Sequence, residues 1–168
     1  MNTDGLNINY LSRNSMYNAS FADIVREHNL LDADRVMNLR KGEVVKQAIA
    51  ERSTVRLILE LGAEKLPVYI KRHFRMPLPK LLFMMLTGSR PRTAVEEFNN
   101  IVFFHRAGIP TVVPIAAGLQ RQGLFQTQSF LITRALEGSI RLDHLLRDRT
   151  LSFTEKKSII ERLALLVR

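Results

Sequence analysis

The fold is decided by the stretch Pro67-Val-Tyr-Ile-Lys-Arg-His73, which is followed by Thr93-Ala-Val-Glu-Glu-Phe-Asn-Asn-Ile-Val-Phe-Phe-His-Arg-Ala-Gly108. The first run has the β-branched and aromatic residues that favour a strand. Side chains alternate between the two faces of a strand, so Lys71 lies on the face opposite Ile70 and Arg72. The sequence therefore predicts a strand that presents Lys71 on one face.

The second run carries the start and stop signals of a helix. Thr93 and Glu96 are spaced as a capping box, and Gly108 is placed to end the helix. Glu97 has no such capping role and lies beside apolar residues, where a carboxylate needs a partner. Alone, Lys71 and Glu97 would each be a solvated surface charge. Their order favours a pair, because a strand lysine and a helix glutamate hold the phosphates of ATP in protein-kinase-like folds.

Further elements are predicted on both sides of these two runs. Antiparallel strands are expected at 43–48, 54–61, 68–74, 112–117 and 126–133. Short helices are expected at 21–28, 32–37 and 139–147, with a capping box of Ser20 and Asp23 at the first of them. A last helix starts at a capping box of Ser152 and Glu155, and its apolar stripe runs through Ile159, Ile160, Leu163, Leu166 and Val167. The predicted fold class is α+β, a five-stranded antiparallel sheet with one main helix.

The predicted domain organisation has three parts. Residues 1–39 form an N-terminal extension with a mobile start and short helices. Residues 40–134 form a lobe of sheet and helix, and residues 135–168 hold a hinge and the first helices of a second lobe. No stop signal precedes Arg168, so we expect this second lobe to be truncated.

The composition is that of an ordinary globular protein, with 46% hydrophobic and 24% charged residues. A net charge of +9 favours phosphates, nucleic acid or an anionic membrane surface as partners without choosing among them. The absence of cysteine excludes disulfides, thiolate metal sites and cysteine nucleophiles. Residues 1–20 do not resemble a secretory signal, and the longest apolar run, 81–86, is too short to span a bilayer. We therefore expect a cytoplasmic protein.

An ordered series of short motifs resembles one family. The motifs are Val44-Val-Lys-Gln47, Arg52-Ser-Thr-Val-Arg-Leu57, Val68-Tyr-Ile-Lys-Arg-His73, Glu97-Phe98, Ala107-Gly-Ile-Pro-Thr111 and Ser129-Phe-Leu-Ile-Thr133. Together they resemble the N-terminal lobe of the bacterial lipopolysaccharide core kinases, the Kdo and heptose kinases of the protein-kinase-like superfamily. The resemblance covers about residues 40–168. It implies an ATP-dependent kinase that phosphorylates a sugar of the lipid A core at the cytoplasmic face of the inner membrane.

The resemblance also implies roles for individual residues, with ATP and Mg²⁺ as cofactors. Lys71 would bind the phosphates and Glu97 would hold the lysine in place, while the hinge would meet adenine through its backbone. Residues 49–52 contain no glycine-rich phosphate loop, so Arg52 and backbone amides are expected to replace it. The predicted nucleotide-binding residues are Lys71, Glu97, Arg52, Thr133, Ala135 and Leu136.

Two catalytic motifs of protein kinases do not occur before Arg168: the His-Arg-Asp-type loop and the Asp-Phe-Gly-type metal motif. We therefore expect the catalytic base and the Mg²⁺ ligands downstream, and we expect these 168 residues alone to be inactive. A pseudokinase-like scaffold, which keeps the lobe without the chemistry, is an alternative. A reading frame that continues into a His-x-Asp motif would favour the kinase, and a genuine stop codon would favour the scaffold.

Basic residues flank the apolar run 78–86, namely Arg72, His73, Arg75, Lys80, Arg90 and Arg92. This composition suits peripheral contact with the anionic inner membrane, and equally a helix packed on the sheet with a basic rim. A noncatalytic anionic-surface or nucleic-acid-binding domain is the rival from another class. Nucleic acid is unlikely as a partner, because no helix-turn-helix, zinc or RNA-recognition signature is present and most aromatic residues fall at expected core positions. The sequence does not determine the acceptor sugar or the oligomeric state.

Overall fold

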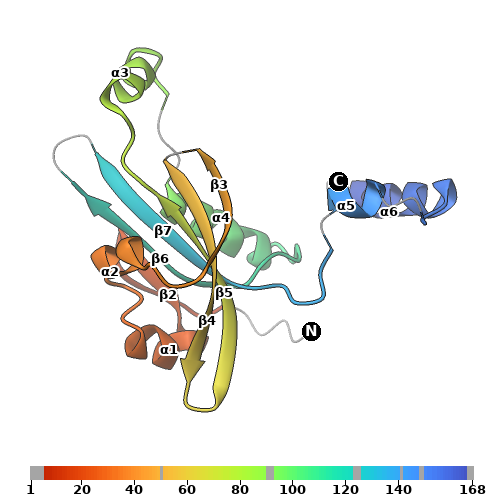
Figure 1. Ribbon diagram of the computed structural model, residues 1–168, viewed down its shortest axis with the longest axis horizontal. Coiled ribbons are helices and arrows are strands. Elements are labelled where there is room, and N and C mark those ends of the chain that lie inside the picture. The colour runs from red at the N-terminus through yellow and green to blue at the C-terminus, as the bar shows by residue number, and fades with distance from the viewer. Residues whose placement is uncertain are drawn as a thin grey trace. The chain divides into compact units, whose positions relative to one another are not determined.

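The computed structural model describes residues 6–49, 51–89, 93–122, 126–140, 142–147 and 150–165. Within these residues, seven strands form one antiparallel sheet in the order β1-β2-β6-β7-β5-β4-β3. The strands are β1 (Ile8–Ser12), β2 (Ser15–Asn18), β3 (Glu43–Ile49), β4 (Arg52–Leu61), β5 (Glu64–His73), β6 (Pro114–Arg121) and β7 (Thr127–Arg134). The helices are a short 3₁₀ turn, η1 (Ala19–Phe21), then α1 (Ala22–Glu27), α2 (Ala33–Asn38), α3 (Leu78–Leu86), α4 (Ala94–Arg106), α5 (Leu142–Arg147) and α6 (Phe153–Leu165) (Figure 1). The α+β class is confirmed, but the predicted number of five strands is wrong.

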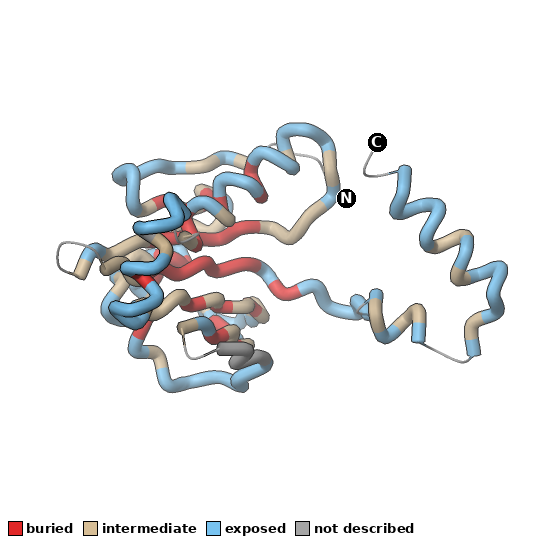
Figure 2. The backbone as a smooth tube through the Cα atoms, turned by 90° about the horizontal axis from the view of Figure 1, so that it is seen from above, coloured by how far each residue is buried: buried red, intermediate tan, exposed pale blue. Residues whose placement is uncertain are grey.

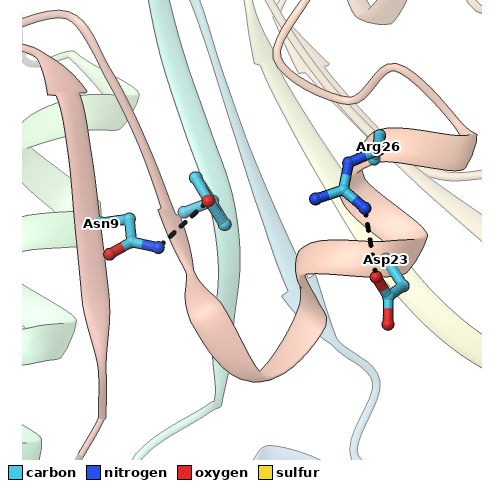
Figure 3. A network of polar contacts seen from close by, with 4 residues as sticks. Asn9, Asp23 and Arg26 are labelled. Atoms are coloured by element: carbon cyan, nitrogen blue, oxygen red, sulfur yellow. Dashed lines mark hydrogen bonds and ion pairs between the residues drawn. The ribbon is translucent and has the colours of Figure 1, made fainter.

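The two additional strands come from a region where a mobile start was expected. β1 and β2 form a hairpin, and β2 joins the sheet by pairing with β6. Within the hairpin, Asn9 Nδ2 donates a hydrogen bond of 3.0 Å to the hydroxyl of Tyr17 on the opposite strand (Figure 3). Most side chains of β1 are exposed, so its sequence lacks the alternation of apolar and polar residues that predicts a half-buried strand. Part of the predicted N-terminal extension therefore belongs to the sheet itself.

Helices cover both faces of the sheet. On one face, α1 packs on β4 and α2 packs on β6 and β7, around a core that contains Ile24, Val25, Leu30, Val36, Met37, Val68, Ile70, Phe130 and Ile132. On the other face, α4 packs around a core of Met16, Ala94, Val95, Phe98, Ile101, Val102, Ala117 and Leu131. Strand β7 supplies alternate residues to both cores and is buried on both sides. Figure 2 shows the buried stretches concentrated along the central strands.

A glycine in β6 makes room for the largest buried ring of the sheet. Gly118 lies directly opposite Phe130 on β7. A Cβ atom at Gly118 would approach the Phe130 ring to 2.5 Å, closer than carbon atoms can pack. Phe130 is fully buried. The lack of a side chain at Gly118 is therefore what lets this ring lie against β6.

The start of α1 differs from the sequence expectation. The predicted capping box of Ser20 and Asp23 does not form, and Phe21 occupies the N-cap position without a side-chain hydrogen bond. Instead, the buried Asn18 accepts a hydrogen bond of 3.1 Å from the Ser20 N–H and caps the 3₁₀ turn before α1. Asp23 contacts Arg26 at 3.4 Å (Figure 3), and both side chains are so exposed that this ion pair contributes about 0–1 kcal/mol.

The chain divides into two compact units, Met1–Ala135 and Leu136–Arg168. The second unit contains α5 and α6, and its predicted capping box is confirmed. The Ser152 N–H donates to Glu155 Oε2 at 2.8 Å, and the Glu155 N–H donates to Ser152 Oγ at 3.3 Å. Hydrogen bonds from the Ser152 side chain and backbone hold the pKa of Glu155 below its ordinary value. The predicted boundaries at residues 39 and 134 stay a prediction.

Two further sequence expectations concern the surface. Phe98 and Phe130 are buried as expected, but Phe83, Phe103 and Phe153 are more than 60% exposed, so the expectation that most aromatic residues lie in the core is wrong for these three. Among the described residues, the helices are too short or too polar to cross a membrane. Arg90, Arg92, Leu166 and Val167 lie outside the described residues.

Candidate functional site

Lys71 on β5 and Glu97 on α4 are in contact. Lys71 Nζ donates a hydrogen bond to Glu97 Oε1, and the two side chains form an ion pair. Lys71 keeps 42% of its side-chain surface exposed and Glu97 keeps 36%, so a ligand could reach both groups. An ion pair this exposed contributes about 0–1 kcal/mol to stability. The ion pair therefore adds little to the stability of the fold.

The register of β5 determines which way Lys71 points. β5 lies between β4 and β7, and Lys71 is directly opposite Thr54 on one side and Leu131 on the other. Val68 and Ile70 face the opposite core and are almost fully buried. A slip of one residue would place Lys71 in that core, so burial of the two apolar side chains fixes the lysine on the face that carries α4.

The first turn of α4 determines where Glu97 points. The predicted capping box is present: Thr93 Oγ1 accepts from the Glu96 N–H at 3.2 Å, and Glu96 Oε2 accepts from the Thr93 N–H at 3.0 Å. Glu96 is thereby occupied by the helix end, which leaves Glu97 for the lysine, as predicted. Phe98 is fully buried against the sheet and orients the helix. Sequence analysis missed Ser129, whose hydroxyl accepts from the first amide of the helix.

Arg72, the neighbour of the site lysine, is not part of the basic surface that the sequence suggested. It is only 9% exposed and faces the core under α2. Its Nη1 donates to the carbonyl oxygens of Met37 at 3.2 Å and Leu39 at 2.8 Å, and its Nε donates to Ser53 Oγ at 3.2 Å. The guanidinium also lies 5.7 Å from the ring centre of Phe74. Burial lowers the pKa of Arg72 from its ordinary value.

Arg52 begins β4 on the same face of the sheet as the site lysine. It is exposed and directly opposite His73, which is two residues from Lys71 along β5. The residues that line a cavity at this end of the sheet include Arg52, His73, Thr93 and Ser129. Next to Arg52, hydrogen bonds to the backbone and to Lys80 lower the pKa of the Glu51 carboxyl. The structure thus places Arg52 at the edge of the site, close to the start of α4.

The predicted adenine-binding residues lie at the end of β7. Thr133 is buried and directly opposite Tyr69, on the same face as the site lysine. The N–H of Ala135 donates to the carbonyl of Pro67 at 2.9 Å and so continues the pairing of β7 with β5. This N–H is engaged, so a contact of Ala135 with adenine would have to use its carbonyl. Leu136 is half-exposed and begins the second unit.

Comparison with known proteins identifies the family. Residues 37–168 match the model of the lipopolysaccharide kinase (Kdo/WaaP) family. The chain belongs to this family. A solved structure of WaaP in complex with acyl carrier protein aligns with a TM-score of 0.50 and 23% sequence identity, which shows likeness of fold. The alignment covers 74% of this chain and 42% of that chain. No curated protein matches this chain.

The family match confirms the resemblance that was drawn from the ordered motifs. The structure also brings together the two residues on which that resemblance was built, Lys71 and Glu97. The binding roles of Arg52, Thr133, Ala135 and Leu136 stay predictions. The sequence did not reveal the contact of Ser129 with Ala94 or the contacts of Arg72 with Met37 and Leu39.

Proposed function

We propose that this chain is the nucleotide-binding lobe of an ATP-dependent kinase that phosphorylates a sugar of the lipopolysaccharide core, Kdo or heptose. The observation that carries the proposal is the contact of Lys71 with Glu97 between a sheet and a helix, in a chain of the lipopolysaccharide kinase family. The proposal concerns the whole protein, because the chain spans less than half the length of the solved structure that it matches.

The proposed role of Lys71 is to bind the α- and β-phosphates of ATP. An extended lysine side chain is flexible, and the Glu97 carboxylate restricts it to one orientation before ATP binds. In the reaction, the bond between the γ-phosphorus and the bridging oxygen breaks, and a bond to a sugar hydroxyl oxygen forms. ADP leaves and the hydroxyl proton is released. Lys71 would stabilise charge on the phosphates during this transfer.

The remaining predicted residues complete the proposed site. Arg52 would contact the phosphates from the edge of the sheet, and the backbone from Thr133 to Leu136 would meet adenine. Mg²⁺, when bound with ATP, would neutralise charge on the β- and γ-phosphates. The described residues contain no cluster of three or more histidine, aspartate or glutamate side chains that fits a metal ion. We therefore assign no Mg²⁺ ligand and no catalytic base to them.

The test compares Lys71→Ala with Lys65→Ala in the full-length protein. Lys65 lies on the same strand, and its ion pair with Glu60 is long and exposed, at 3.9 Å. A hydrogen bond to a charged group is worth about 1.5–3 kcal/mol. We expect kcat/KM for ATP to fall about 10- to 100-fold in Lys71→Ala and to stay unchanged in Lys65→Ala. Transfer of labelled phosphate to acceptors that end in Kdo or in heptose measures the activity and shows which of the two sugars is phosphorylated.

The same assay separates the alternatives. A wild-type protein that binds ATP but transfers no phosphate to either acceptor would favour the pseudokinase-like scaffold. A wild-type protein that binds no ATP but retains affinity for nucleic acid or anionic vesicles would favour the noncatalytic binding domain. An unchanged kcat/KM in Lys71→Ala would contradict the role assigned to the lysine.

The surface of α3 supports contact of the same protein with an anionic membrane. The helix lies beyond one end of the sheet (Figure 1), and it exposes more than half of each of four large apolar side chains, those of Leu78, Leu82, Phe83 and Leu86. Residues 75–89 include the cations Arg75 and Lys80 and no carboxylate, and Lys80 pairs with Glu51 outside this segment at 3.3 Å. Apolar side chains beside cations suit the interface of an anionic bilayer. Such contact would bring the kinase to a lipid-linked acceptor.

Sedimentation with vesicles tests this contact. We expect the full-length protein to bind vesicles that contain phosphatidylglycerol more strongly than vesicles of phosphatidylcholine alone. The double variant Leu82→Ser with Phe83→Ser should lose most of this binding, whereas Leu11→Ser, at an exposed apolar residue of β1, should retain it. Binding that is indifferent to the anionic lipid would contradict the proposal.

A further inference from the structure

A serine of β7 joins the start of α4 to the sheet. Ser129 Oγ accepts a hydrogen bond of 3.0 Å from the backbone N–H of Ala94. Both residues are buried, with 3% and 0% of their surfaces exposed. The first amide of a helix has no acceptor within the helix. Ser129 therefore supplies from the sheet an acceptor that neither the helix nor water provides.

This contact lies close to the ion pair on both of the elements that carry it. Ala94 precedes Glu97 by three residues, about 4.5 Å along the helix axis. Ser129 is directly opposite His73, two residues from Lys71, or about 6.6 Å along the strand. The hydrogen bond thus ties α4 to the sheet about one helical turn away from the contact between Lys71 and Glu97.

The other interactions of α4 cannot define its position along the sheet in the same way. The capping box of Thr93 and Glu96 lies within the helix end and would form wherever the helix lay. The apolar contacts of Phe98 hold the helix against the sheet, but hydrophobic contacts have no preferred direction. A hydrogen bond depends on both distance and angle. The short side chain of Ser129 therefore allows the helix start only one place along β7.

We propose that Ser129 is a positioning residue for the nucleotide site: it holds α4 at the point along the sheet where Glu97 reaches Lys71. This inference rests on the proposed function. Ser129 acts through Glu97, because its buried hydroxyl is engaged by the first amide of α4. Its loss should therefore weaken the binding of ATP, in addition to any fall in the melting temperature.

The test measures KM for ATP, kcat and the melting temperature of the full-length protein with three serine variants. Ser129→Ala removes the acceptor, Ser129→Thr keeps a hydroxyl, and Ser53→Ala removes the buried hydroxyl that accepts from Arg72 under the opposite face. We expect Ser129→Ala to raise KM for ATP about tenfold, the scale of one lost hydrogen bond to a buried group. Ser129→Thr should restore KM to within about threefold of wild type. Ser53→Ala should lower the melting temperature and leave KM unchanged.

A lower melting temperature with unchanged KM in Ser129→Ala would overturn the proposal, as would an equal rise of KM in Ser53→Ala. If Ser129→Ala does not fold, the double variant Ser129→Ala with Ala94→Pro takes its place. Proline is well accepted at the first position of a helix and has no N–H to leave unpaired. The extended backbone of Thr93, with φ −97° and ψ 157°, suits a following proline. A wild-type KM in this double variant would also overturn the proposal.

Lys71→Ala, measured alongside, keeps the two proposals separate. A wild-type protein without affinity for ATP would remove the proposed function and this inference together. A wild-type protein whose affinity is lost in Lys71→Ala but unchanged in Ser129→Ala would overturn only the role of Ser129.

Discussion

Replacing Arg72 by methionine is expected to destabilise the protein by about 3 kcal/mol. Methionine fills the space of the arginine stem but donates no hydrogen bond, so Met37, Leu39 and Ser53 each lose a donor. At about 1.5 kcal/mol each, three bonds from a charged group contribute about 5 kcal/mol. Relief from burying the guanidinium returns about 2 kcal/mol of this. In a protein of this size the net loss corresponds to a fall in melting temperature of about 6–12 °C.

Thermal unfolding and urea unfolding, each followed by circular dichroism, measure this loss, with Arg121→Met on the exposed end of β6 as the matched control. The midpoint should fall in Arg72→Met and stay within error in the control. Because two of the three lost bonds end at the C-terminus of α2, hydrogen exchange should rise more in α2 than in α4. A melting temperature within about 2 °C of wild type would refute the reasoning that these bonds stabilise the fold.

Three further outcomes follow from single residues. Gly118→Ala should destabilise by about 1–3 kcal/mol in thermal unfolding, because its methyl group would press on the Phe130 ring; an unchanged melting temperature would show that the ring can move aside. Asn18→Ala, which removes a buried cap, should lose about 1–2 kcal/mol in the same assay, and a smaller loss would show that water replaces the cap. The pKa of Glu155 is lowered in the folded state. Its capping bonds therefore stabilise α6 fully when the pH is above the ordinary pKa of 4.5, and this stabilisation is lost as the pH falls through the lower pKa of the folded state. A carboxylate titration by NMR should give a midpoint below 4.5 that returns toward 4.5 in Ser152→Ala, and equal midpoints would contradict the assignment.

The local signals in the sequence predicted the start of α4 and the contact between Lys71 and Glu97. The capping box of Thr93 and Glu96 could be predicted because its two residues are three positions apart and interact within one helical turn. The same spacing showed that Glu97 had no role in the cap, and its contact with Lys71 is confirmed. What ATP does there stays a prediction, since the contact by itself identifies no ligand.

The errors arose where the interactions join distant parts of the chain. Spacing predicted Ser20 as the cap of α1, whereas Asn18 caps the 3₁₀ turn before it and also donates to the carbonyl of Pro114 at 3.3 Å, 96 residues away. Ser129 holds Ala94 across 35 residues, which no local pattern reveals. Arg72 is a different kind of miss. The alternation of side chains along the strand placed Arg72 on the apolar face with Ile70. Its charge nevertheless led to its being counted among the basic surface residues.

The core under α1 and α2 bears on where this protein can be divided. The family match begins at residue 37, but Ile24, Val25 and Leu30 lie before that point and belong to the same core as Val68 and Ile70. A gene fragment or chimera that started at the family boundary would lose these side chains and strand β2, and it would expose Val68 and Ile70 to water. The segment that matches the family and the segment that forms the folded core therefore begin at different residues. Expression trials and domain exchanges should include the residues from β1 onward.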